Sequence, residues 1–377
     1  MEFDLASITG RSPLVEYPWR NEIDRLLNWL QDKEPSVKAF CFDVVMSAAY
    51  IDATSGIEKS IEGCENTPSR FNSHLGFINL CSPCYTSKGV WSYQKAVKPQ
   101  SGALGKLSSE VILRFIEKLS TQLNDVIAVG GTEAADAVLY HQDGTAILAE
   151  VKSAPLLTYP FLFSAPNSCL QGEHEKLVIT NSQLRECDSG MYFHNVGVIN
   201  LGKVGSPLWP FKPIVDFLTQ ENNEHFIKEC VQEWTAARTA YTIKDRTNKM
   251  YYLANACGSP PKIAKDRDGW PRKESISDSK TSAGLDRTDD IKKGIYQSIK
   301  IGTSIKNSPD IKTAIVSNLP AYRHGDDYVS PFINMLWGLG EDLVELNGYN
   351  AIIEKDLRRV FDFIITLEQP VLRNTIL

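Results

Sequence analysis

The feature that most constrains the fold is a hairpin near the middle of the chain, where two apolar segments flank a short polar turn. The segments are residues 134–141 and 145–152, and the turn is Gln142-Asp143-Gly144. Each segment has the length of a strand. A turn that ends in glycine suits a three-residue hairpin loop, because glycine adopts the left-handed backbone conformation without strain. We therefore expect an antiparallel pair of strands here.

The charged side chains of the hairpin form a pattern that depends on its register. Side chains alternate between the two faces of a strand, so Glu150 and Lys152 share one face and Val151 points to the other. A three-residue loop places Asp136 opposite Glu150. A two-residue loop pairs Asp136 with Val151 instead and turns the two acids to opposite faces. The first register brings two carboxylates and an ammonium group together.

Two carboxylates on adjacent strands point to metal chemistry. Such groups repel each other unless a proton or a cation lies between them. Mg²⁺ prefers oxygen ligands, binds through one or two carboxylates and keeps its remaining positions for water and phosphate oxygens. We predict that Asp136, Glu150 and the main-chain carbonyl of Val151 bind Mg²⁺, and that Lys152 orients water and stabilises transition-state charge. The alternative interpretation is an exposed strand face with ordinary charges.

The hairpin resembles the catalytic hairpin of the PD-(D/E)xK nuclease superfamily, which includes most type II restriction endonucleases. The family pattern is an acid on one strand and then Asp or Glu, any residue and Lys on the next. In this chain Glu150-Val151-Lys152 matches, whereas Ala135-Asp136 lacks the proline of the motif. The resemblance implies that Asp136 and Glu150 bind the metal ion and that Lys152 acts on the nucleophilic water.

The resemblance extends to the helices expected on either side of the hairpin. Many family members add a glutamate from the helix before the hairpin, and the choice between Glu110 and Glu117 is open here. A Gln or Lys in the helix after the hairpin often lies near the metal ion or a DNA phosphate. Lys293 and Gln297 are the residues that the resemblance implies for this role.

The expected elements follow the order helix, three strands, helix, strand. Their approximate ranges are 107–123, 125–131, 134–141, 145–152, 288–305 and 312–317. The fold class that we expect is α/β: a restriction-endonuclease-like core, with a mixed central sheet flanked by helices, an N-terminal helical region and a large insertion. The expected domains are an N-terminal region, 1–105, and a core, 106–377, with its insertion at about 153–285. A further helix is expected at about 328–345.

Four cysteines in the N-terminal region are candidates for a structural zinc site. Cys81-Ser82-Pro83-Cys84 has the two-residue spacing of a zinc knuckle, and Cys41 and Cys64 lie upstream. Four thiolates can hold Zn²⁺ in a closed tetrahedral site, which would stabilise the region or support DNA recognition. The alternative is that these cysteines are buried apolar residues.

The charge of the chain is uneven. The net charge is -6, yet residues 262–306 contain eight Lys and three Arg against seven acids, which gives this window a net charge of +4. Basic side chains contact phosphates and can read bases in DNA, although a solvated surface loop is the alternative. Besides Lys293 and Gln297, the predicted DNA-binding residues are Lys262, Lys265, Arg267, Arg272, Lys273, Lys280 and Arg287.

Together these features predict a type II restriction endonuclease: Mg²⁺-dependent hydrolysis of phosphodiester bonds in double-stranded DNA at a specific short palindromic sequence. A homodimer would supply one active site for each strand. The alternatives are another PD-(D/E)xK nuclease, acting in DNA repair or on junctions, and a non-catalytic DNA-binding protein that contains zinc. We expect no membrane contact and a cytoplasmic protein of prokaryotic type, because the sequence has no membrane-spanning run and its cysteines suit a reducing compartment.

Overall fold

A computed structural model gives the fold in two compact units, which are described separately. The model describes residues 5, 8–54, 59–61, 71–73, 82–88, 101–130, 135–165, 170–171, 176–254, 282–286, 288–305, 311–353 and 356–368. Unit 1 comprises Met1–Val15, Ile112–Ala154 and Gly284–Leu377, and unit 2 comprises Glu16–Val111 and Pro155–Ala283. This grouping differs from the expected division at residue 105, because most of the N-terminal region joins the insertion in unit 2.

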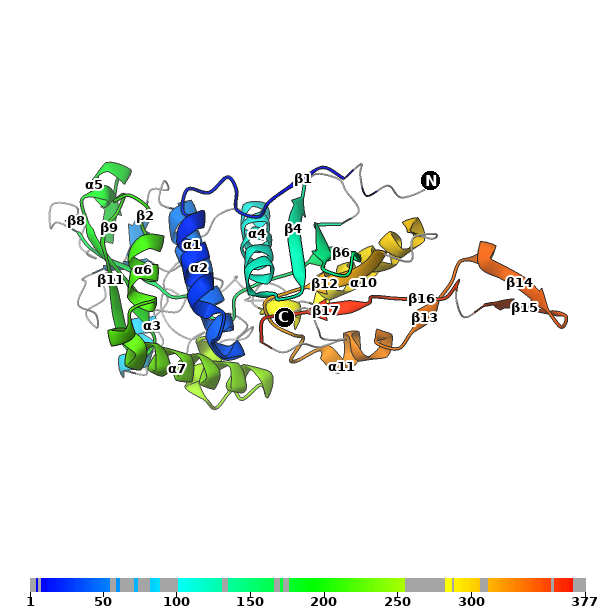
Figure 1. Ribbon diagram of the computed structural model, residues 1–377. Helices are drawn as coiled ribbons and strands as arrows, with labels where there is room; N and C mark the ends of the chain where they lie inside the picture. Colours follow the sequence, from blue (N-terminus) through cyan, green and yellow to red (C-terminus); the bar gives the residue numbers. More distant parts are fainter. Residues whose placement is uncertain are drawn as a thin grey trace. The chain divides into compact units, whose positions relative to one another are not determined.

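Unit 1 is built on a six-stranded mixed sheet with the strand order β1-β4-β5-β6-β12-β17 (Figure 1). The strands are β1 (Gly10–Arg11), β4 (Leu123–Val129), β5 (Ala137–His141), β6 (Ala146–Val151), β12 (Ile311–Val316) and β17 (Phe363–Ile365). Neighbours from β1 to β6 pair antiparallel, whereas β12 is parallel to both β6 and β17. The expected mixed α/β class, with a mixed central sheet flanked by helices, is confirmed.

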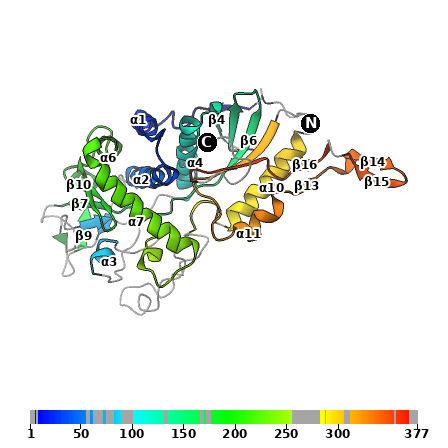
Figure 2. The same ribbon diagram turned by 60° about the horizontal axis from the view of Figure 1, so that its bottom comes forward.

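Two helices complete the expected order of elements. Helix α4 (Ser101–Leu119) precedes β4, and α10 (Thr288–Ser304) connects the insertion to β12. In both views α4 lies beside β4, and α10 lies beside β6 and β12 (Figures 1 and 2). Ile301 of α10 and Ile305, which directly follows the helix, pack with Leu148 in one buried cluster. Helix α10 therefore covers the face of the sheet to which Leu148 points.

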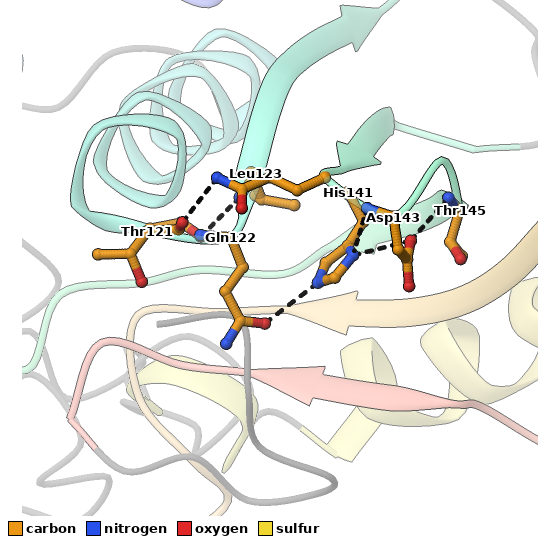
Figure 3. A network of polar contacts seen from close by, with 8 residues as sticks. Thr121, Gln122, Leu123, His141, Asp143 and Thr145 are labelled. Atoms are coloured by element: carbon orange, nitrogen blue, oxygen red, sulfur yellow. Dashed lines mark hydrogen bonds and ion pairs between the residues drawn. The ribbon is translucent and has the colours of Figure 1, made fainter.

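The turn between β5 and β6 has the predicted three-residue form. The main-chain N–H of His141 donates to the carbonyl of Thr145 at 2.9 Å, and Gly144 has a φ of +92°. Figure 3 shows the polar contacts of this turn: the Asp143 carboxylate accepts a hydrogen bond from the Thr145 N–H at 2.8 Å and lies 2.8 Å from His141 Nδ1. On its other side, His141 Nε2 lies 3.1 Å from Oε1 of Gln122. The turn is therefore fixed by side chains as well as by glycine.

The pKa of Asp143 gives the first testable prediction. The N–H of Thr145, followed by the Thr145 and His141 side chains, lowers this pKa to about 2. A carboxyl whose pKa is lowered by folding stabilises the folded state above its unfolded pKa, and that contribution is lost as the pH falls toward 2. Asp143→Ala should therefore lower the melting temperature slightly at neutral pH. The difference in melting temperature between Asp143→Ala and the unchanged protein should become smaller below about pH 4, near the unfolded pKa of Asp. A difference that stays the same at every pH would show that the Asp143 carboxylate does not stabilise the fold in this way.

The C-terminal part of unit 1 differs from the expected helix at about 328–345. Its described residues form a short α-helix, α11 (Gly325–Tyr328), and two 3-10 helices, η6 (Ser330–Phe332) and η7 (Gly340–Asp342). They also form two pairs of antiparallel strands: β13 (Leu336–Trp337) with β16 (Arg358–Arg359), and β14 (Leu343–Leu346) with β15 (Tyr349–Ile352). The helix prediction was wrong because the end of the expected range pairs as β14 with β15, across a tight turn just beyond it in which Asn347 and Gly348 both adopt positive φ, 51° and 79°. Two consecutive left-handed residues end a helix and join antiparallel strands.

Unit 2 combines helices with two further sheets. The described helices are α1 (Arg20–Leu30), α2 (Pro35–Thr54), α3 (Ser82–Lys88), α5 (Asn181–Arg185), α6 (Phe211–Leu218) and α7 (Glu224–Thr242). The sheets are β11-β10-β7-β3 and β2-β9-β8, formed by β2 (Lys59–Ile61), β3 (Phe71–Ser73), β7 (Phe161–Ser164), β8 (Leu170–Gln171), β9 (Lys176–Ile179), β10 (Asp188–Phe193) and β11 (Gly197–Lys203). The region expected at the N-terminus and the insertion thus form one folded body.

A buried carboxylate explains why the N-terminal helices and the insertion belong to the same unit. Asp43 in α2 is fully buried and accepts hydrogen bonds from the N–H groups of Leu156 and Leu157, at 3.2 and 2.8 Å. It also accepts one from Nε1 of Trp234 in α7 at 2.8 Å. One side chain therefore ties α2 to two separate parts of the insertion.

Among the helices of the described residues, none is long and apolar enough to cross a lipid bilayer.

Candidate active site

The pairing of β5 with β6 brings the two predicted acids to the same end of the hairpin. The pairing of Ala137 with Ala149 and Val138 with Leu148 follows the three-residue register. Asp136 lies directly before β5, at the end of this pairing. The N–H of Asp136 donates to the carbonyl of Ala149 at 3.0 Å. The three-residue register is therefore confirmed for the paired strands up to Ala137 and Ala149, and Asp136 follows at the end of the ladder with its N–H on Ala149.

Three charged side chains converge at the end of the hairpin. Nζ of Lys152 donates to Oε1 of Glu150 at 2.5 Å and lies 3.7 Å from Oδ2 of Asp136. It also donates to the main-chain carbonyl of Val151 at 3.1 Å. Asp136 Oδ2 accepts a hydrogen bond from the N–H of Val151 at 2.9 Å. The predicted metal ligands and the predicted catalytic lysine thus form a single cluster.

Burial separates Glu150 from an ordinary surface charge. The Glu150 side chain is 8% exposed, whereas the Asp136 side chain is 43% exposed. Burial raises the pKa of Glu150, and the nearby charge of Asp136 raises it further, while Lys152 acts in the opposite direction. The interpretation of this face as an exposed set of charges does not apply to Glu150. A buried carboxyl beside a more exposed one is an arrangement that a bound cation stabilises.

The raised pKa of Glu150 predicts how its amide variant should behave. A carboxyl whose pKa is raised by folding binds its proton more tightly in the folded state, so stability falls as the pH rises through that pKa. Glu150→Gln removes this charge and should melt no lower than the unchanged protein at neutral pH in EDTA. Mg²⁺ should raise the melting temperature of the unchanged protein but not of Glu150→Gln. If Mg²⁺ raised the melting temperature of both proteins equally, Glu150 would not be a ligand of the metal ion.

Helix α10 covers the site through a glycine. A Cβ atom at Gly294 would lie 4.0 Å from Cγ of Glu150 and 3.3 Å from Cδ1 of Ile315 on β12. A larger side chain here would press on the face that carries Glu150. Sequence reasoning missed this role for Gly294, and the available signal was a glycine inside an otherwise amphipathic helix.

The oxygens of the cluster suit a divalent cation. The ammonium group of Lys152 already contacts or approaches one oxygen each from Glu150, Val151 and Asp136, so these oxygens face one positive charge. Mg²⁺ takes this kind of donor set, one or two carboxylates supplemented by water. No group of three or more His, Cys, Asp or Glu side chains in the described residues could hold a metal ion. A metal site here must therefore use the two carboxylates with main-chain or water oxygens.

The other residues implied by the family resemblance differ in how far they are exposed to solvent. Lys293 is exposed on α10, and Gln297 is half-buried with an Oε1 that makes no hydrogen bond in the described part of the chain. Glu117 forms an ion pair with Arg114 at 2.5 Å, and Glu110 is only 4% exposed. Both glutamates of α4 are thus at least partly buried. The predicted DNA-binding residues Lys262, Lys265, Arg267, Arg272, Lys273, Lys280 and Arg287 lie outside the described residues.

Two of the four candidate zinc ligands can be placed. Cys41 in α2 is fully buried, and burial raises the pKa of its thiol, which favours the protonated form over the thiolate that binds zinc. Cys84 in α3 is partly exposed. Cys64 and Cys81 lie outside the described residues. The buried state of Cys41 matches the alternative that we gave for it, an apolar residue.

Comparison of the chain with protein-family models, with curated proteins and with solved structures found no match in any of the three.

Proposed function

We propose that the chain is a Mg²⁺-dependent nuclease that hydrolyses phosphodiester bonds in DNA, and that its active site is the cluster of Asp136, Glu150 and Lys152. The observation that carries this proposal is the convergence of two carboxylates, one of them buried, and an ammonium group on adjacent strands. The proposal rests on this geometry together with the resemblance of the motif to PD-(D/E)xK nucleases.

The chemistry assigns a separate task to each group. Asp136, Glu150 and the carbonyl of Val151 would hold the ion, which when bound offsets charge on the phosphate and makes a water more acidic. Lys152 has a side chain that is only 20% exposed, so its charge acts with little competition from solvent. Its ammonium group would orient the attacking water and stabilise the phosphate as the phosphorus–oxygen bond breaks.

The finer proposal is a type II restriction endonuclease that acts as a homodimer in the cytoplasm. One site cuts one strand, so two copies related by a two-fold axis would cut a duplex at a palindrome. The basic window 262–306 would supply phosphate contacts in a chain whose net charge is -6. The second candidate, a repair or junction nuclease, would use the same cluster on a different DNA structure.

The proposal is tested by incubating the purified chain with a plasmid of mixed sequence and, separately, with a branched duplex. Each substrate is tested in Mg²⁺, in Ca²⁺ and in EDTA. Discrete bands in Mg²⁺ alone are the expected result, and sequencing the fragment ends gives the recognition site. A smear, or cleavage of the branched DNA alone, would favour the second candidate. Intact DNA under every condition, or equal cleavage in EDTA, would contradict the proposal.

A further inference from the structure

A buried amide side chain holds the end of strand β6, just beyond the catalytic lysine. Asn318 follows β12 and is 1% exposed. Its Nδ2 donates to the carbonyl of Ala154 at 2.8 Å, and its Oδ1 accepts from the N–H of Ala154 at 3.1 Å. A single side chain therefore satisfies both main-chain groups of a residue that lies two positions after Lys152.

A second contact on the same carbonyl fixes its position further. The N–H of Gly284 also donates to the carbonyl of Ala154, at 3.0 Å. Gly284 has a φ of +51°, and a Cβ atom there would lie 2.6 Å from both Cβ and the carbonyl oxygen of Leu319. Only glycine fits so close to that backbone without displacing it. The segments after β6, before α10 and after β12 therefore meet at Ala154.

The backbone of Lys152 lies between two fixed points. On one side, its N–H donates to the carbonyl of Val316 at 2.9 Å, directly after the last regular pair of β6 and β12. On the other side, Ala154 is held by Asn318. Strand β6 itself ends at Val151. The contacts of Asn318 thus replace strand pairing at the point where the chain leaves the sheet.

We propose that Asn318 is a positioning residue for Lys152. Its hydrogen bonds hold the backbone of Ala154 in place, and this keeps the Lys152 ammonium group hydrogen-bonded to Glu150 and to the carbonyl of Val151. The effect of this role on DNA cleavage rests on the proposed function, whereas its effect on the lysine does not. Asn318 touches neither the two acids nor the Lys152 side chain in the contacts described above, so it acts through the backbone.

The kinetic consequence is a loss of rate without a loss of DNA affinity. Asn318→Ala should lower kcat by about 10- to 100-fold, the range typical of residues that orient catalytic groups. KM for DNA should stay unchanged, because a displaced lysine affects the transition state more than substrate binding. The matched control is Ile311→Ala, which removes buried packing at the opposite end of β12 and should leave kcat close to that of the unchanged protein.

A double-mutant comparison separates positioning from general destabilisation. If Asn318 acts through Lys152, Asn318→Ala should cause no further loss of kcat in a Lys152→Ala background. A purely structural role would lower the rate in both backgrounds. Equal losses of kcat in the two backgrounds would overturn the proposal.

A measurement on the lysine itself keeps the test independent of cleavage. In protein with ¹⁵N-labelled lysine, the Lys152 ammonium signal is identified by its loss in Lys152→Ala and should be visible when the group is held by its partners. We expect Asn318→Ala to weaken or shift this signal and Ile311→Ala to preserve it. An unchanged signal in Asn318→Ala would overturn the inference. A chain that cuts no DNA but shows the expected loss of signal would refute only the proposed function.

Discussion

Replacing either acid of the site, by Glu150→Ala or Asp136→Ala, is expected to reduce the rate of DNA cleavage by more than about 100-fold. This exceeds the effect usually seen for residues that only orient a metal ligand, because each change removes an oxygen that would contact the ion. The remaining carboxylate would bind the ion more weakly and would leave the charge on the phosphate without an adequate counter-charge. The rate is measured on plasmid DNA with saturating enzyme and Mg²⁺.

A neighbouring acid provides the control for this experiment. Asp125 is exposed on β4 of the same sheet, and its carboxylate accepts a hydrogen bond from the adjacent N–H of Val126 at 2.9 Å. Asp125→Ala should cleave DNA at nearly the rate of the unchanged protein. Circular dichroism should show that all three variants are folded. Full activity in either Glu150→Ala or Asp136→Ala would remove that residue from the active site.

The largest effect on stability is expected from Asp43→Ala in unit 2. The change leaves the buried N–H groups of Leu156, Leu157 and Trp234 without their acceptor. An unsatisfied buried donor costs roughly 1–3 kcal/mol, so a loss of about 3 kcal/mol or more is expected. Urea unfolding measures the loss, and peptide-level hydrogen exchange should locate it in α2 and in the segment after Pro155.

Two further variants separate the hydrogen bonds of Asp43 from its charge. Asp43→Asn keeps one acceptor oxygen and should lose less stability than Asp43→Ala. Asp32→Ala, at an exposed position shortly before α2, should change stability little, since surface substitutions of this kind usually stay within about 0.5 kcal/mol. A loss of the same size in Asp32→Ala would show that the buried hydrogen bonds are not the cause.

The central elements could be predicted from the sequence because their signals are local. A glycine-ended turn between two apolar segments set the register of β5 and β6, and that register brought Asp136 and Glu150 to the same end of the hairpin. The helix expected at 288–305 is α10, Thr288–Ser304. By contrast, the turn at Asn347-Gly348 was a local hairpin signal that the helix prediction overlooked.

Other features depend on contacts between distant parts of the chain and have no local signal. All six residues of β6 are buried, including Glu150, because α10 packs across a face that the sequence pattern indicated to be half polar. The link from Asp43 to Leu157 spans 114 positions. It joins the N-terminal helices to the insertion, and neither composition nor periodicity reveals such a pairing. The burial that raises the pKa of Glu150 is therefore a result of the folded structure alone.

The central claim is that Asp136 and Glu150 form a divalent-metal site, and titration with Mn²⁺ followed by electron paramagnetic resonance tests it most directly. Mn²⁺ accepts the same oxygen ligands as Mg²⁺, and its signal reports binding without any need for DNA or cleavage. The structure predicts saturable binding to the unchanged protein that Mg²⁺ displaces. It also predicts much weaker binding to a protein that carries both Asp136→Asn and Glu150→Gln. Equal Mn²⁺ affinity in the two proteins would contradict the claim.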